Sequence, residues 1–305
     1  MSRRRTERSA LDAFTAAAER AAGDVIDEYS TSFGLATKLL GPRHRQHVRN
    51  VYAMVRVADE IVDGVAAEAG LDRAGQLAAI DAYETQTEHA IRTGYSSDLV
   101  LHAFARTARE SNIGSDLTGP FFASMRADLG PEGADSDAAE GLVYDAAAHE
   151  SYVHGSAEVV GLMCLQVFLR ESSPSEADLA VMKHGACRLG AAFQNVNFLR
   201  DLADDTDRLG RSYLAETGRL TDADRDAWVQ TVREQLADAA KAIPLLPHDA
   251  RAAVRSALAL FAALTDKVAR TPAEQLYRER VRVPDPVKAR LAAGAVLTTW
   301  REGRA

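Results

Sequence analysis

The sequence predicts an all-α protein that folds as a single domain. The 305-residue chain is rich in alanine, leucine, arginine and glutamate, which have high helix propensity. No segment alternates apolar and polar residues with the period of two that is typical of a strand. Length alone would allow about two domains. No proline- or serine-rich linker divides the chain, however, so one helical domain is expected.

Glycine and proline breakers separate the helices and capping patterns mark several of their starts. In order, the predicted helices cover residues 11–29, 43–62, 72–93, 98–111, 137–170, 175–204, 221–242, 248–270 and 285–302. Ser173-Pro174-Ser175-Glu176 combines an N-cap serine, a first-turn proline and a capping-box glutamate. Thr271-Pro272-Ala273-Glu274 repeats that pattern, and Thr221 to Asp224 is a weaker version of it.

Composition and charge exclude several classes of function. The formal net charge of −8 argues against a nucleic-acid partner. Two cysteines, Cys164 and Cys187, are too few for a disulfide framework and fit a reducing, cytoplasmic setting. The apolar run 291–300 is too short to span a bilayer. Residues 1–10 are basic and lack the apolar core of a signal peptide, so we expect a disordered tail before a domain at 11–305.

The segment 51–63 is apolar on most sides, which indicates a buried helix, yet it carries one polar stripe. The stripe consists of Tyr52, Arg56, Asp59 and Asp63, at relative positions 0, 4, 7 and 11. At 3.6 residues per turn these side chains cover an arc of about 60°.

Residues 194–205 repeat this arrangement. Here the stripe consists of Gln194, Asn197, Asp201 and Asp205, at positions 0, 3, 7 and 11, an arc of about 80°. Local pairing, of Arg56 with Asp59 or of Arg200 with Asp204, could account for either stripe alone. Both stripes together carry more carboxylates than two arginines can neutralise, and buried unpaired carboxylates are costly. A divalent cation between the two helices would supply the missing charge, and Mg²⁺ binds carboxylate, water and phosphate oxygens.

The two acidic segments, Asp59-Glu60-Ile61-Val62-Asp63 and 197–205, resemble the aspartate-rich motifs of the squalene/phytoene synthase family. Further ordered similarities cover most of the chain: Tyr29-Ser30-Thr31-Ser32-Phe33, the lead-in 52–56, the central segment 152–168, Gly210-Arg211-Ser212-Tyr213-Leu214, and Arg280-Val281-Arg282-Val283. The residue strings look closer to those of bacterial phytoene synthases. Two positions depart from the family pattern: Glu158 stands where a small residue is usual, and Phe261 where a tyrosine is common.

The resemblance implies a single helical bundle with a deep central cavity, of the isoprenoid synthase type. It implies a Mg²⁺-dependent prenyltransferase, with Mn²⁺ as a substitute ion, whose substrates are prenyl diphosphates. Two geranylgeranyl diphosphates would condense head to head, through a cyclopropylcarbinyl diphosphate, to phytoene. NADPH is not expected, and no glycine-rich dinucleotide fingerprint follows a strand. Peripheral membrane contact would serve product release, and the oligomeric state is left open.

Family roles carry over to this chain residue by residue. The implied metal ligands are Asp59, Asp63, Asp201 and Asp205, and with Arg56 and Tyr152 they form the implied catalytic set. The implied substrate-binding residues are Ser30, Ser32, Phe33, Tyr52, Ala157, Gly161, Gln194, Asn197, Arg200, Arg211, Tyr213 and Arg280.

Two alternatives remain beside phytoene formation. A squalene or dehydrosqualene synthase would use the same residues on farnesyl diphosphate. A non-catalytic relative that acts in protein assembly would often lose the acidic set, whereas this chain keeps all four aspartates. We expect Glu158 to point away from the prenyl channel, because an ionised carboxylate there would be costly and could quench a carbocation.

Overall fold

The structure is a computed structural model that describes residues 9–130, 146–202 and 219–303; of Thr31, Ser32 and Ala146 it describes only the backbone. Every element in these parts of the chain is helical, as predicted. The first half contains α1 (Ala10–Tyr29), α2 (Thr31–Lys38), α3 (Pro42–Asp63), α4 (Val65–Glu68), α5 (Arg73–Thr93), α6 (Leu99–Ser111) and α7 (Ser115–Asp128).

The second half begins with a nearly continuous helical rod. It consists of α8 (Ala146–Val153), the π-helix η1 (His154–Glu158) and α9 (Val159–Leu169). The long helix α10 (Glu176–Arg200) follows. After it come α12 (Asp222–Ala242), the short η2 (Ile243–Leu245), α13 (His248–Arg270), α14 (Ala273–Leu276) and α15 (Asp285–Glu302).

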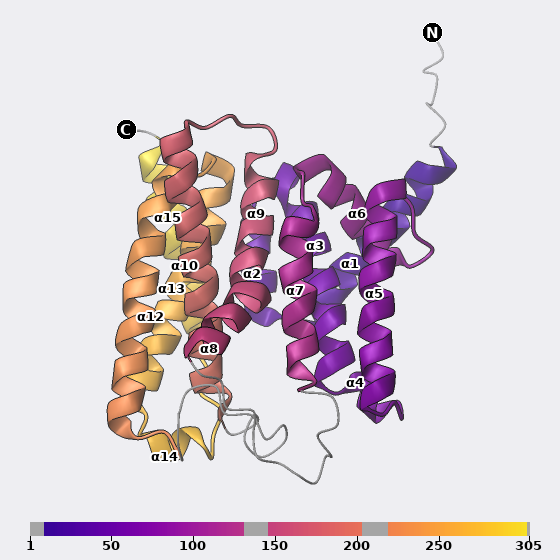
Figure 1. The fold of residues 1–305 in the computed structure, drawn as a ribbon. Helices are drawn as coiled ribbons and strands as arrows, with labels where there is room; N and C mark the ends of the chain where they lie inside the picture. The colour runs from indigo at the N-terminus through magenta and orange to yellow at the C-terminus, as the bar shows by residue number, and fades with distance from the viewer. Residues whose placement is uncertain (1–8, 131–145, 203–218, 304–305) are drawn as a thin grey trace.

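The long helices run roughly along one direction and form two groups (Figure 1). Helices α1, α3, α5, α6 and α7 lie on one side, α10, α12, α13 and α15 on the other, and α2 and α9 lie between them. Each group has its own apolar cluster: Phe104, Phe121 and Met54 are buried in the first, Leu199, Val232 and Leu276 in the second. The boundary between the two groups is where the functional site lies.

Several helices begin where capping chemistry stabilises the first turn. The predicted cap at Thr221 is confirmed: its hydroxyl accepts a hydrogen bond from the Asp224 N–H, and the Asp224 carboxylate accepts one from the Thr221 N–H. The predicted cap at Ser173 is wrong, because α10 starts two residues later with Ser175 as its N-cap. Thr271 is not the N-cap of α14 either, because Pro272 occupies that position; Thr271 is instead the C-cap of α13.

Four α-helices in the described residues were not among the predicted helices: α2, α4, α7 and α14. Gly119-Pro120 indicated a chain break, but Pro120 lies inside α7. The predicted helix at 175–204 is also too long, since α10 ends at Arg200 and Asp201 is its C-cap. The predicted helix at 137–170 is divided by the π-helix, and residues 137–145 lie outside the described part of the chain.

One described stretch, Ala147–Leu169, is long and apolar enough to cross a membrane by length and composition. No membrane span was predicted from the sequence. Half of the relevant window is buried inside the protein, and α9 packs against α3, α7 and α10. A buried core helix meets the same criteria, so this stretch is weak evidence for a span.

Candidate active site

A cavity of about 1010 Å³ lies between the two helix groups. It is lined by α2, α3, η1, α9, α10 and α13, and the ends of α7 and α15 also reach it. Most of the predicted site residues line it: Ser30, Phe33, Tyr52, Arg56, Asp59, Asp63, Tyr152, Ala157, Gly161, Gln194, Asn197, Arg200 and Arg280. Asp205, Arg211 and Tyr213 lie outside the described residues, as does the side chain of Ser32.

The polar stripe of α3 faces the cavity, as the sequence spacing predicted. Arg56 forms a salt bridge with Glu60, its Nη1 lies 3.9 Å from Asp59 Oδ2, and its guanidinium lies 4.7 Å from the centre of the Tyr29 ring. Local pairing of Arg56 is therefore directed mainly at Glu60, and Asp59 keeps its carboxylate towards the cavity.

The environment of Asp59 disfavours its charged form. Burial raises the pKa of this carboxyl well above its usual range, Asp63 and Asp128 raise it further, and Arg56 partly offsets the shift. The Asp59 side chain is 30% exposed, and it lines the cavity. Negative charge thus accumulates at this end of the cavity.

The second acidic stripe differs from its prediction. Asp201 lies beyond the end of α10 and is not among the residues that line the cavity. Its carboxylate accepts a hydrogen bond of 2.8 Å from Arg200 Nε, and its Oδ1 lies 2.7 Å from Arg280 Nε. Two guanidinium groups therefore balance its charge, and both of those arginines line the cavity.

Two charged residues that were not among the predicted site residues also line the cavity, Asp128 and Lys288. Asp128 is the last residue of α7, and its buried carboxylate accepts a 3.0 Å hydrogen bond from the Tyr152 hydroxyl. Lys288 lies in the first turn of α15, 3.0 Å from Asp285. An acidic residue at the C-terminal end of a helix and a basic residue in the first turn are both unfavourable for the helix dipole. This unfavourable placement is a sequence signal that could have identified Asp128 and Lys288 as candidate site residues.

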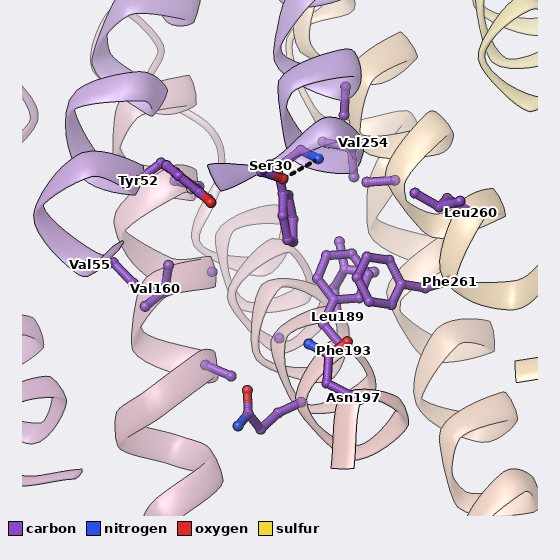
Figure 2. Close-up of a pocket in the computed structure, with 18 of the residues that line it drawn as sticks. Ser30, Tyr52, Val55, Val160, Leu189, Phe193, Asn197, Val254, Leu260 and Phe261 are labelled. Atoms are coloured by element: carbon purple, nitrogen blue, oxygen red, sulfur yellow. Dashed lines mark hydrogen bonds between the residues drawn. The ribbon is translucent and has the colours of Figure 1, made fainter. Parts of the chain in front are cut away.

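Beyond the charged end, the cavity wall is apolar. Val160 and Leu189 lie on opposite walls, from α9 and α10, and the lining continues to Phe168, Met182 and Leu246 (Figure 2). At the junction of the two regions, the rings of Phe193 and Phe261 stack with their centres 3.7 Å apart. Phe261, which stands where a tyrosine is common, thus contributes a ring surface and no hydroxyl.

The small residues of the central rod also have a packing role. A Cβ added at Gly161 would lie 2.6 Å from the carbonyl oxygen of Ala186, and one at Gly190 would lie 2.5 Å from that of Ala157. These glycines let the rod and α10 approach each other closely, so Gly161 is small for packing as well as for the channel.

Glu158 lies outside the cavity, as predicted: it is not among the lining residues. Its partner is His154, whose Nδ1 lies 2.9 Å from the Glu158 carboxylate. The π-helix brings this pair together on the side of the rod that faces away from the cavity.

The residues present offer oxygen ligands for a divalent cation. The side-chain oxygen of Asn197 is buried and has no hydrogen-bond partner among the described residues. Burial, with the neighbouring carboxylates of Asp63 and Asp128, raises the pKa of Asp59. Within residues 9–130, 146–202 and 219–303, no three His, Cys, Asp or Glu side chains gather closely enough to hold a metal ion. Asp59, Asp63 and Asn197 fit Mg²⁺ by donor type.

A helical bundle whose central cavity is charged at one end and apolar along its body defines a class: a protein that binds an anionic head group joined to a long apolar chain. Comparison with known proteins specifies the class further. The model of the squalene/phytoene synthase family matches residues 26–286. This chain belongs to the squalene/phytoene synthase family.

Individual relatives agree with this assignment. Phytoene synthase 3, chloroplastic, of Zea mays is 30% identical over 283 residues, which cover 87% of this chain and 62% of the maize protein. The chain therefore spans less than two thirds of that relative's length. The 15-cis-phytoene synthase of Synechocystis is 26% identical, over 87% of this chain and 80% of the relative.

A solved structure shares the fold. The crystal structure of a dehydrosqualene synthase in complex with ligand superposes with a TM-score of 0.75 and 20% sequence identity. The match covers 94% of this chain and 98% of that one. The predicted fold, a helical bundle of the isoprenoid synthase type with a central cavity, is confirmed.

Proposed function

We propose that this protein joins two geranylgeranyl diphosphates head to head and releases diphosphate to form phytoene. The observation that carries the proposal is the cavity, which combines a charged end with a long apolar body. The maize and cyanobacterial relatives are named phytoene synthases, which supports the C20 substrate. Family membership and retention of Asp59, Asp63, Asp201 and Asp205 support a catalytic protein over a non-catalytic assembly factor.

In this proposal the charged end holds both diphosphates. Asp59, Asp63 and Asn197, together with Asp205, would hold Mg²⁺, which neutralises the charge that develops on the leaving diphosphate. Arg56 adds a fixed positive charge beside these carboxylates. Arg200, Arg280 and Lys288 line the cavity as well and would bind the second diphosphate.

The apolar body would hold the two prenyl chains and exclude water. Ionisation breaks the C1–O bond of one chain and leaves an allylic cation, which the double bond of the second chain attacks; loss of a proton gives the cyclopropylcarbinyl diphosphate. Because an apolar wall excludes water, the cation would be attacked by the second chain and not hydrolysed. A second ionisation, rearrangement and proton loss give phytoene, and no step requires hydride, so NADPH is not needed.

A second candidate is the same coupling of two farnesyl diphosphates, which have shorter chains. It would give dehydrosqualene or, with hydride, squalene. The fold likeness to a dehydrosqualene synthase supports it. It would use the same charged end, its two shorter chains would fill less of the apolar body, and the squalene product would additionally require hydride.

The deciding experiment offers labelled farnesyl and geranylgeranyl diphosphates to the purified protein. Each incubation contains Mg²⁺, Mn²⁺ or a chelator, with and without NADPH, and products are identified by mass. We expect phytoene from the C20 substrate, full dependence on the divalent ion, and no effect of NADPH. A larger kcat/KM for the C15 substrate would replace the phytoene proposal with the second candidate. No coupling of either substrate would favour a non-catalytic role.

A further inference from the structure

Three connections between helices close the apolar end of the cavity. Leu40 lies between α2 and α3, Phe168 lies near the end of α9, and Leu246 lies shortly before α13. All three side chains are buried and line the cavity, and together they form its distal wall. On α10 the lining extends from Asn197 at the charged end to Met182, about 22 Å along the helix axis. Met182 belongs to the same apolar cluster as the distal wall.

A charged residue follows each residue of the distal wall by three positions. These are Arg43, Glu171 and Asp249, and their side chains form a distal ion-pair network. Arg43 donates to both carboxylate oxygens of Asp249, at 2.8 and 2.9 Å, and to Glu171 at 2.9 Å. The network therefore joins the starts of α3 and α13 to the segment just after α9.

Further contacts hold the same segments together. The Gly41 N–H donates to the Asp249 carbonyl at 2.8 Å, and a Cβ at Gly41 would overlap the Asp249 side chain. Asp249 Oδ1 also lies 3.2 Å from Nε2 of His44, which is fully buried. The His44 ring packs edge-on against Phe168, with ring centres 5.5 Å apart. Asp249 thus supports the distal wall through His44 as well as through Arg43.

The network lies outside the cavity, at the end away from the charged groups. The connection that contains Glu171 and helix α14 lie at opposite ends of the bundle (Figure 1), and Arg280 of the charged end closely follows α14. The network side chains are 36% to 50% exposed and do not line the cavity. Exposed ion pairs usually contribute little, but a bidentate arginine within a network of several charges is an exception.

We propose that the distal ion-pair network sets the longest prenyl chain that the cavity accepts, a specificity role that rests on the proposed function and extends it. A chain whose diphosphate is held at the charged end points its other end at the distal wall. One further C5 unit would have to displace Leu40, Phe168 or Leu246. The network resists this displacement because it fixes all three connections at once. Its residues touch no substrate and act by positioning the wall.

The test compares geranylgeranyl diphosphate (C20) with geranylfarnesyl diphosphate (C25). Arg43→Ala should raise kcat/KM for C25 relative to C20 roughly tenfold, because the wall loses its bidentate support. Arg43→Lys keeps the charge but not the bidentate geometry, so its ratio should be intermediate. The matched control is Arg126→Ala, which removes an arginine that pairs with Asp81 and Glu84 and does not line the cavity. It should leave the ratio unchanged.

Two further measurements do not depend on turnover or on the folding of Arg43→Ala. Unreactive thiodiphosphate analogues of the C20 and C25 substrates, bound in the presence of Mg²⁺, should show the same shift in relative affinity in Arg43→Lys. Salt screens exposed charges, so raising the ionic strength should increase the relative affinity of the unsubstituted protein for the C25 analogue.

The outcomes separate this inference from the proposed function. An unchanged ratio in a less stable Arg43 variant, or an equal shift in Arg126→Ala, would overturn the role of the network while turnover remains. A preference for farnesyl diphosphate would overturn the phytoene proposal, and the network would then be judged by the same ratio for C20 over C15. Absence of coupling would overturn the proposed function, whereas the relative affinities of the analogues would still confirm or contradict the role of the network.

Discussion

Asp59 and Asp201 are the same residue type in opposite electrostatic environments. Burial and neighbouring carboxylates raise the pKa of Asp59, so its charge is unfavourable in the folded protein. Asp201, by contrast, lies between the guanidinium groups of Arg200 and Arg280. Equal substitutions at the two positions should therefore change stability in opposite directions.

The prediction concerns Asp59→Asn and Asp201→Asn. The first should raise the free energy of unfolding at pH 7, because it removes a charge that burial and neighbouring carboxylates disfavour. The second should lower it by about 2 kcal/mol, because two arginines lose their partner. Asp59→Asn should also reduce kcat at least a hundredfold, because its carboxylate is a proposed Mg²⁺ ligand. Urea unfolding and steady-state kinetics test this, and retained activity in a folded Asp59 variant would contradict the metal assignment.

His47 makes stability depend on pH. Burial, with Arg170 nearby, lowers the pKa of its imidazole to about 4 from the usual 6.5, and its Nδ1 lies 3.0 Å from Thr107 Oγ1. Above pH 6.5 the ring is neutral in both the folded and unfolded states. Below pH 6.5 the imidazole becomes protonated in the unfolded chain but stays neutral in the folded protein. The free energy of unfolding therefore falls as the pH drops from 6.5 towards 4.

We expect His47 alone to lower the free energy of unfolding by about 3 kcal/mol between pH 6.5 and pH 4. His47→Gln should flatten the corresponding part of a pH series of urea unfolding curves, with both proteins compared first at pH 8 as the reference. An unchanged slope between pH 6.5 and 4 in the variant would show that other groups, such as the buried His44, carry the effect.

At the scale of elements, the central rod depends on close approach to α10. Gly161→Ala and Gly190→Ala would each place a Cβ within 2.6 Å of a carbonyl oxygen. Each should lower the free energy of unfolding by about 2 kcal/mol and reduce turnover, because the helices must separate. Gly294→Ala on α15, with nothing within 4 Å of the new Cβ, is the matched control and should stabilise the protein by up to about 1 kcal/mol. Thermal unfolding of the three variants tests the contrast.

The π-helix carries the Glu158–His154 pair away from the cavity. Glu158→Gln should lower stability by less than about 1 kcal/mol, since both side chains are partly exposed, and should leave the product unchanged. Ala157→Leu, on the cavity side of the same element, should instead reduce turnover or alter the product. Product analysis by mass decides, and a new product from Glu158→Gln would assign this carboxylate a role in catalysis.

At the scale of the molecule, the two helix groups should unfold together. Helix α13 contributes to both apolar clusters, and Asp249 at its start lies 2.8 Å from Arg43 at the start of α3. We expect one urea transition, with far-UV circular dichroism and tryptophan fluorescence coinciding, because Trp228 packs on the second cluster while dichroism reports both. Two separated transitions would contradict a single domain over residues 11–305.

The sequence by itself determined the fold class, the family and the first half of the site. Helix propensity and periodicity are local, so they identify α1, α3, α5 and α13 within a few residues of their ends. The spacing of Tyr52, Arg56, Asp59 and Asp63 follows from helix geometry alone, which is why their common face could be predicted.

Tertiary structure decided the features that depend on packing between helices. Pro120 lies inside α7, and its carbonyl oxygen packs closely against Gly155 of η1. This contact cannot be predicted from the sequence of either segment alone. Asp201 lies just beyond the end of α10, where its carboxylate pairs with Arg200 and with Arg280 from a distant segment of the chain. Asp128, Lys288 and the stacked rings of Phe193 and Phe261 become part of one site only when four distant segments close around the cavity. Local sequence patterns do not encode such distances, because the energies that set them arise from contacts formed on folding.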